Sequence, residues 1–370
     1  MLELAEIFRR YGPAYRAKFA DRVLPSHLAA MAAIERCRTE ALGGHLYQCA
    51  ACGELEYSYH SCKNRHCPKC QNDAATRWLE QQRTLLLPVP YFLVTFTLPE
   101  ELRPVARAHQ HCLYNLLFQT SAAALQALAL DPHYLGGQIG MVGVLHTWTR
   151  DLAYHPHVHY LVPGGGLSPE GEQWRSPRSA AWLVPVRALS RLFRGKFKAA
   201  LATATELCAL VPPQVWHKDW VTHCQPAGSG TEVLTYFAPY IYRIALTNNR
   251  LETLEDGQVT FRFQKRNSAG WKRLTLPADA FIHRFLQHVL PRGFCKVRAY
   301  GLLSPRQRQR LPQLRTLLAT DLPTAPAPEC ASPRAPAPPA PTPAVDRGCR
   351  HCGGPLVFLG RLTRHPREPP

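Results

Sequence analysis

The residues best suited to chemistry lie in the stretch 154–163, which reads Tyr-His-Pro-His-Val-His-Tyr-Leu-Val-Pro. Its β-branched and aromatic residues favour a strand, which Pro163 and the glycines that follow it would close. Because side chains alternate along a strand, His157 and His159 would share one face, about 7 Å apart. Two imidazoles placed in this way can bind one cation from one side, although ordinary surface histidines produce the same pattern.

A pair of tyrosines, Tyr236 and Tyr240, lies downstream in the stretch 231–246. Residues four apart share one face of a helix, and Pro239 would bend that helix or lie in its first turn. Tyrosine, with a pKa of about 10, is a weak nucleophile unless a cation polarises the target phosphate. A histidine pair with a tyrosine pair could therefore break a DNA strand covalently, whereas an aromatic stripe packed on a sheet would show the same spacing.

Cysteines form a third candidate site. The chain has 13 cysteines, and six of them lie in residues 37–70. Two Cys-x2-Cys knuckles, Cys49/Cys52 and Cys67/Cys70, predict four thiolates around one tetrahedral Zn²⁺. A second zinc ion could be held by the remaining candidate ligands, Cys37, His45, Cys62 and His66, or Cys62 and His66 could replace one knuckle.

A further cysteine pair, Cys349 and Cys352, lies near the C-terminal end. It is half of a zinc knuckle, so Cys330, His351 or His365 would have to complete the ligand set, and such a remnant could also stay without metal. The preceding residues 322–343 are rich in Pro and Ala and show no periodic apolar face, which predicts a flexible linker.

The formal charge is +18, from 44 Lys and Arg against 26 Asp and Glu, and the basic residues are spread along the chain. This distribution favours a broad polyanion-binding surface, most often for nucleic acid. The knuckle loops carry Lys63, Arg65 and Lys69, which we expect to contact DNA phosphates, although a zinc unit can also be purely structural. Without a signal-peptide pattern or an apolar run of roughly 18 residues, we expect a cytoplasmic protein with no membrane partner.

The elements that must position these residues indicate an α+β fold. Helical patterns occur at 2–22, 26–40, about 110–130 and about 184–210. The runs 91–98 and 139–149 favour strands, and a short turn at Arg150 and Asp151 would join the second run to the histidine strand as an antiparallel hairpin. Such a hairpin could place His146 near His157 or His159 as a third metal ligand.

The assembled residues resemble the two-tyrosine HUH transposases of the IS ninety-one type. The resemblance runs in order over most of residues 8–305 and rests on the stretches 62–70, 155–159, 240–248, 292–294 and 297–302. It implies a zinc-binding N-terminal domain followed by an HUH endonuclease domain with a central antiparallel sheet. The implied activity is nicking of one DNA strand, formation of a 5′-phosphotyrosine, and strand transfer in rolling-circle transposition.

Carried over residue by residue, the resemblance makes Tyr236 and Tyr240 the nucleophiles. His157 and His159, with His146 as the third candidate, would hold Mg²⁺ or Mn²⁺, and structural Zn²⁺ would belong to the cysteine cluster. The implied partners are single-stranded transposon ends and target DNA. Pro239, inside the tyrosine pair, departs from the family pattern.

The predicted domain limits are 1–85 for the helical and zinc-binding domain, 86–305 for the catalytic domain, 306–347 for the linker and 348–370 for the cysteine tail. A rolling-circle replication initiator or relaxase would share the histidines and tyrosines, but a cysteine cluster ahead of them favours a transposase. A non-catalytic zinc-dependent DNA-binding protein would explain the charge and the cysteines and would leave the histidines and tyrosines without a role.

Overall fold

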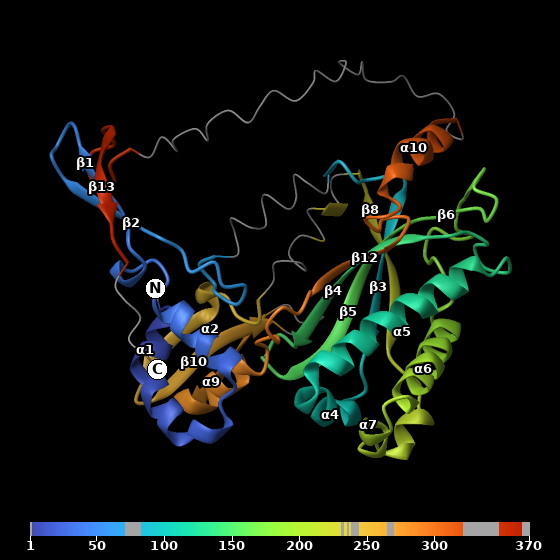
Figure 1. Ribbon diagram of the computed structural model, residues 1–370, viewed down its shortest axis with the longest axis horizontal. Coiled ribbons are helices and arrows are strands. Elements are labelled where there is room, and N and C mark those ends of the chain that lie inside the picture. The colour runs from blue at the N-terminus through green and yellow to red at the C-terminus, as the bar shows by residue number, and fades with distance from the viewer. Residues whose placement is uncertain are drawn as a thin grey trace.

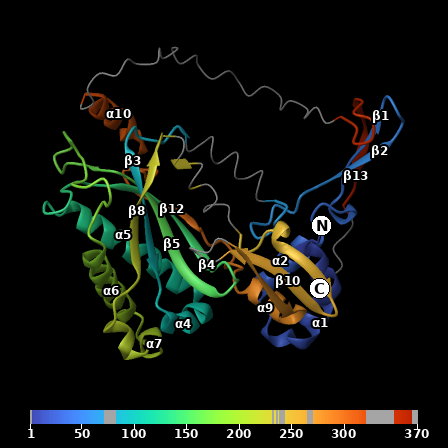
Figure 2. The ribbon, with the colours of Figure 1, turned by 180° about the vertical axis from the view of Figure 1, so that it is seen from behind.

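The computed structural model describes residues 2–70, 83–230, 233–234, 237, 244–264, 270–320 and 348–364. Figures 1 and 2 show a large sheet with helices on one face, a second body built from both early and late segments, and a small sheet beside that second body. No helix in the described part of the chain has the length and hydropathy that a membrane span requires.

The large sheet has five antiparallel strands and confirms the predicted α+β class. In spatial order, its strands are β12 (Val297–Gly301), β4 (Gly140–Trp148), β5 (Tyr154–Pro163), β3 (Pro90–Thr97) and β8 (Thr222–Ser229). Strands β4 and β5 form the hairpin predicted from the sequence, and β5 lies in the middle of the sheet. The histidine strand is therefore supported by a paired neighbour on each side.

One face of this sheet is covered by helices that precede or follow its strands in the sequence (Figure 1). They are α4 (Arg103–Ala108), α5 (Gln110–Leu130), α6 (Val186–Ala202) and α7 (Thr205–Ala209). Phe96, Val158 and Tyr160 are fully buried in the core that the sheet forms with α5 and α6. Since neighbouring side chains of a strand point to opposite faces, His157 and His159 lie on the face away from these helices.

The second body joins the N-terminal helices to a segment from the later half of the chain. It contains α1 (Leu4–Lys18), α2 (Pro25–Glu35), the three-stranded sheet of β9 (Leu251–Glu255), β10 (Gln258–Gln264) and β11 (Trp271–Pro277), and α9 (Ala278–Leu286). Phe8 of α1 packs edge-on against Phe285 of α9, with ring centroids 5.6 Å apart. The packing thus brings residues from the predicted catalytic range against the N-terminal helices.

The small sheet combines the two ends of the chain. Strand β1 (Gly44–Cys49) lies between β2 (Leu55–Tyr59) and β13 (Leu356–Leu362), and all three are antiparallel to their neighbours. The cysteine tail therefore forms a strand of the N-terminal sheet.

The remaining short elements are β6 (Gly166–Leu167), β7 (Trp174–Arg175), α10 (Leu311–Thr320) and the 3₁₀ turns Ala20–Arg22, Glu40–Leu42, Glu100–Leu102, Pro213–Trp216, Asn248–Arg250 and Arg308–Arg310. Helix α10 lies within the range 306–347 that was predicted as linker. Its Leu314 and Leu318 are buried in a cluster with residues of the large sheet, so the prediction is wrong for this first part of the range. The leucines of α10 recur at helical spacing. In the sequence they directly precede the Pro-rich residues, and so they were included in the predicted linker.

Candidate metal centre and DNA-processing face

His146, His157 and His159 come together on the face of the large sheet that points away from α5 and α6. The register of β4 and β5 places His146 directly opposite His157, and His159 follows on the same face. The ring centroids lie 5.5 Å apart for His146 and His157, 5.0 Å for His146 and His159, and 4.7 Å for His157 and His159. One ring nitrogen of each lies within 4.8 Å of the others, which is an arrangement that can close on one metal ion.

Hydrogen bonds orient two of these rings. Nδ1 of His157 donates to the backbone carbonyl of His155 at 2.7 Å, and Nδ1 of His159 lies 2.9 Å from the hydroxyl of Thr95 on β3. With the proton on Nδ1, the acceptor lone pair of each ring lies on Nε2, the arrangement usual for a metal-binding histidine. His146 is buried and stacks on Trp148, with centroids 4.7 Å apart.

The three histidines line an open cleft of about 630 Å³, within the roughly 300–1,000 Å³ of typical ligand sites. The other lining residues are Leu93, Thr95, Thr97, Trp148, Thr149, Arg150, Asp151, His155, Val221, His223, Gln225, Arg250 and Phe263. The guanidinium groups of Arg150 and Arg250 are held by backbone carbonyls, such as Gln264 for the first and Arg262 for the second. Arg150 and Arg250, beside the single carboxylate of Asp151, give the lining a net positive charge, which favours binding of a phosphate.

His155 extends the row of histidines by one position. Arg103 donates from Nη2 to its Nδ1 at 2.9 Å. Burial, with a smaller contribution from the Arg103 charge, lowers the pKa of His155, so this ring is neutral at neutral pH. His155 is not among the three histidines whose ring nitrogens lie together.

Tyr236 and Tyr240 lie outside the described residues, as does Pro239. The described residues next to them, Val233 and Phe237, are fully buried and belong to the same cluster as Leu93 and Val144 of the large sheet. Leu93 lies opposite Leu161 in the pairing of β3 with β5, and Val144 lies opposite His159 in the pairing of β4 with β5. Val233 and Phe237 therefore pack on the sheet face that carries the histidines.

Eight of the twelve cysteines in the described part of the chain gather in two groups, and the grouping corrects the predicted ligand set. One group contains Cys37, Cys62, Cys67 and Cys70, and the other contains Cys49, Cys52, Cys349 and Cys352. The two knuckles predicted to share one ion are separated by the length of the hairpin that β1 and β2 form. Cys49 and Cys52 lie at the tip of this hairpin, whereas Cys37 and Cys62 flank its base and join the second knuckle.

The first group has the spacing of a structural zinc site. The Sγ atom of Cys70 lies 3.5 Å from that of Cys37 and 3.6 Å from that of Cys62. Thiolates about 2.3 Å from a tetrahedral ion lie roughly 3.8 Å from one another, whereas a disulfide requires about 2.05 Å. These four residues fit Zn²⁺.

The two candidate histidine ligands lie in neither group of the described chain. The ring of His66 is buried and accepts a hydrogen bond from the backbone N–H of Leu290 at 3.3 Å. Burial holds its pKa well below the usual range. His45 instead packs edge-on against His60 and Phe358. Both histidines serve packing, which the cysteine spacing alone did not reveal.

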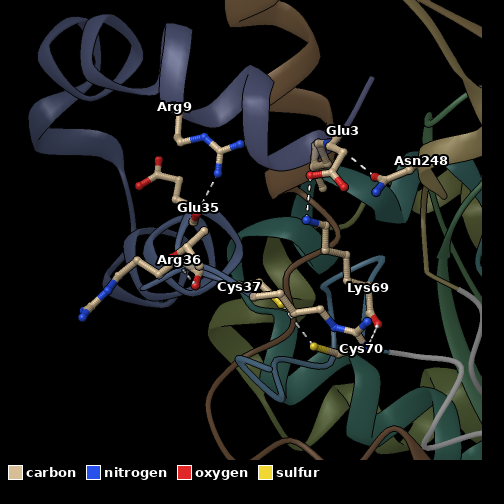
Figure 3. A network of polar contacts seen from close by, with 11 residues as sticks. Glu3, Arg9, Glu35, Arg36, Cys37, Lys69, Cys70 and Asn248 are labelled. Atoms are coloured by element: carbon tan, nitrogen blue, oxygen red, sulfur yellow. Dashed lines mark hydrogen bonds and ion pairs between the residues drawn. The ribbon is translucent and has the colours of Figure 1, made fainter. Parts of the chain in front are cut away.

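Two of the three basic residues predicted to contact DNA have partners inside the protein. Arg65 donates to the carbonyls of Pro291 at 2.8 Å and Phe294 at 2.5 Å, and it thereby holds the chain that follows α9. Figure 3 shows Lys69 reaching Glu3, with an N–O distance of 2.7 Å, beside Cys70. Lys63 is exposed, so the prediction of phosphate contact now rests on this residue.

Comparisons with known proteins agree with this architecture. Residues 7–98 match the family described as "Transposase zinc-binding domain", and residues 140–310 match the family described as "Putative transposase". The chain is 44% identical over 341 residues to "Putative transposase y4qJ" of Sinorhizobium fredii, covering 87% of this chain and 85% of that protein. It is 26% identical over 349 residues to "Transposase for insertion sequence element IS801" of Pseudomonas savastanoi pv. phaseolicola, covering 88% and 82%. No solved structure matches.

A zinc-binding N-terminal unit, an antiparallel sheet with three grouped histidines and these two relatives define a DNA transposase. The chain belongs to the IS ninety-one type of insertion-sequence transposases.

Proposed function

We propose that this transposase nicks one DNA strand with Tyr236 or Tyr240 as nucleophile and transfers the strand by a rolling-circle mechanism. The observation that carries the proposal is the group of His146, His157 and His159 in an open, positively balanced cleft. The burial of Val233 and Phe237 on the same sheet face supports it, since these residues adjoin the tyrosines in the sequence.

The three histidines would hold a divalent ion whose charge polarises the scissile phosphate when it is bound. Of the two expected ions, Mn²⁺ suits imidazole ligands better than Mg²⁺, which prefers oxygen ligands and keeps its water. Thr95 and the His155 carbonyl keep two imidazole rings in the orientation that such an ion needs. Arg150 and Arg250 would orient the flanking phosphates, because their guanidinium groups already lie in the wall of the cleft.

The proposed reaction is a transesterification. The Oη atom of one tyrosine forms a bond to phosphorus as the bond from phosphorus to the 3′ oxygen breaks. The phenolic proton is lost and the leaving oxygen gains a proton, so a free 3′-hydroxyl and a 5′-phosphotyrosine result. Two tyrosines would allow a second strand to be cut before the first covalent link is resolved.

The wild-type protein should form a covalent adduct with single-stranded DNA that carries an element end. The test is incubation of end-labelled oligonucleotides with Mn²⁺ or Mg²⁺, followed by a denaturing gel that separates free DNA from DNA attached to protein. An adduct with a free 3′-hydroxyl on the other fragment is expected. Cleavage that leaves free 5′-phosphates and no adduct would instead indicate hydrolysis by an activated water.

Thr95→Val should weaken metal binding at the histidines by roughly 10–100-fold, the usual effect of losing an outer partner of a ligating histidine. The substitution keeps the shape of the side chain and removes the hydroxyl that lies 2.9 Å from His159 Nδ1. Mn²⁺ affinity can be followed by electron paramagnetic resonance. Thr97→Val is the matched control, because Thr97 lines the same cleft and its hydroxyl, in the described part of the chain, makes no hydrogen bond to His159. Equal affinities in the two variants would contradict the proposed role of Thr95.

A further inference from the structure

The second cysteine group is assembled from opposite ends of the chain. The Sγ atoms of Cys49 and Cys352 are 3.5 Å apart across a sequence separation of 303 residues, and those of Cys52 and Cys349 are 3.7 Å apart across 297 residues. These distances are close to the roughly 3.8 Å edge of a zinc tetrahedron and far from the length of a disulfide bond. Cys349 and Cys352 lie outside both family matches, which end at residues 98 and 310.

The two halves of this group have the same backbone geometry. Each reads Cys-x2-Cys-Gly, and the glycine that follows each pair has a left-handed φ, +75° at Gly53 and +76° at Gly353. The N–H of each glycine donates to the carbonyl of the first cysteine of its pair, at 2.9 Å and 2.8 Å. In the tail, the N–H groups of His351 and Gly354 also point to the cysteine sulfurs, at 3.4 Å each. Such N–H groups stabilise thiolates.

The sheet that carries this group has almost no core of its own. Across β1, β2 and β13, only Gly44 and Cys49 are buried. No residue of these strands belongs to the buried clusters of the described chain. Val357, Phe358 and Leu359 of β13 are each about half exposed. A small sheet that buries so little apolar surface needs a cross-link to be stable.

We propose that Cys49, Cys52, Cys349 and Cys352 bind a second Zn²⁺ in a split ribbon that closes the N-terminal zinc unit with the C-terminal tail. The ion would hold β13 on the edge of β1. The N-terminal segment supplies two of the four ligands, and the C-terminal tail supplies the other two. This inference concerns metal binding and architecture, and it does not depend on the tyrosine chemistry proposed above.

Thiol alkylation of the full-length, zinc-loaded protein tests the proposal under reducing conditions. Cys52 and Cys352 are exposed, so burial cannot protect them from a reagent, whereas a bound ion can. Cys295 is also exposed and belongs to neither cysteine group, which makes it the internal reference. We expect Cys295 to react quickly while Cys52 and Cys352 react at least about tenfold more slowly, with each site read by mass spectrometry.

Replacing a cysteine of one pair should remove the ion and so expose the thiols of the other pair to the reagent. In Cys49→Ser, Cys349 and Cys352 should react at a rate near that of Cys295, while Cys37 and its partners stay protected. The double variant Cys349→Ser/Cys352→Ser should lose one of about two zinc ions per chain, and Cys295→Ser should lose none. The tail variant cannot disturb the large core, because its cysteines contact none of the buried clusters. Rapid labelling of Cys352 in the zinc-loaded wild type, or an unchanged zinc content in the tail variant, would overturn the proposal.

Discussion

Replacing Tyr236 and Tyr240 together by Phe should abolish covalent capture of a cleaved DNA strand. Each substitution keeps the aromatic ring and deletes only the hydroxyl that would attack phosphorus, so the thermal stability should change little. Loss of a catalytic nucleophile lowers rates by up to about 10⁶-fold in well-studied enzymes, so the adduct should fall below detection. The measurement is the denaturing-gel assay of adduct formation, with DNA affinity determined in parallel.

The single variants separate two arrangements of the same chemistry. Each single variant should still form an adduct if the tyrosines are interchangeable, and only one should if their roles are ordered. Tyr57→Phe is a suitable control, because Tyr57 is 49% exposed on β2, a strand of the small sheet that lines no part of the cleft. An adduct that persists in the double variant would point to Tyr242, the remaining tyrosine of the stretch 231–246. Tyr160 is an unsuitable nucleophile because it is fully buried and hydrogen-bonded to Ser121 on the helical face.

The histidine group could be predicted from the sequence because its geometry is local. Alternation along a strand places His157 and His159 on one face, and a short turn fixes the neighbouring strand closely enough to bring in His146. The same local logic predicted the antiparallel hairpin, whereas the central antiparallel sheet was implied by the family resemblance. Local logic did not predict that β9–β11 and α9 pack on the N-terminal helices, because that contact depends on which apolar faces meet in three dimensions.

The cysteine ligand sets could not be predicted because spacing identifies knuckles and not their partners. A Cys-x2-Cys pair supplies two corners of a tetrahedron, and any other pair in the chain can supply the remaining two. Here the β1–β2 hairpin moves Cys49 and Cys52 away from Cys67 and Cys70. The partner of the first knuckle then comes from the far end of the chain. The internal role of Arg65 could not be predicted for a similar reason, since local sequence does not show that its guanidinium is held by carbonyls that follow α9.

His157→Ala should lower the nicking rate by more than about 100-fold, because losing a direct metal ligand should cost more than losing an outer partner of one. The affinity for single-stranded DNA should stay within about twofold, since phosphate contacts by basic residues supply most of the affinity of a chain with a formal charge of +18. Nicking rates and fluorescence anisotropy measure the two quantities on the same oligonucleotide. His133→Ala is the control, as His133 is exposed beside Asp131 and lies outside the cleft.

This substitution also resolves an ambiguity that chelation leaves open. A chelator would remove a metal from the histidines and zinc from both cysteine groups, so loss of nicking after chelation could reflect a collapsed zinc unit. His157→Ala leaves all eight grouped cysteines in place, and its zinc content should equal that of the wild type. A variant with full zinc, normal DNA affinity and no nicking would locate the catalytic ion at the histidines. If His157→Ala nicked at the wild-type rate, the histidines would have a structural role and the catalytic ion would have to bind elsewhere.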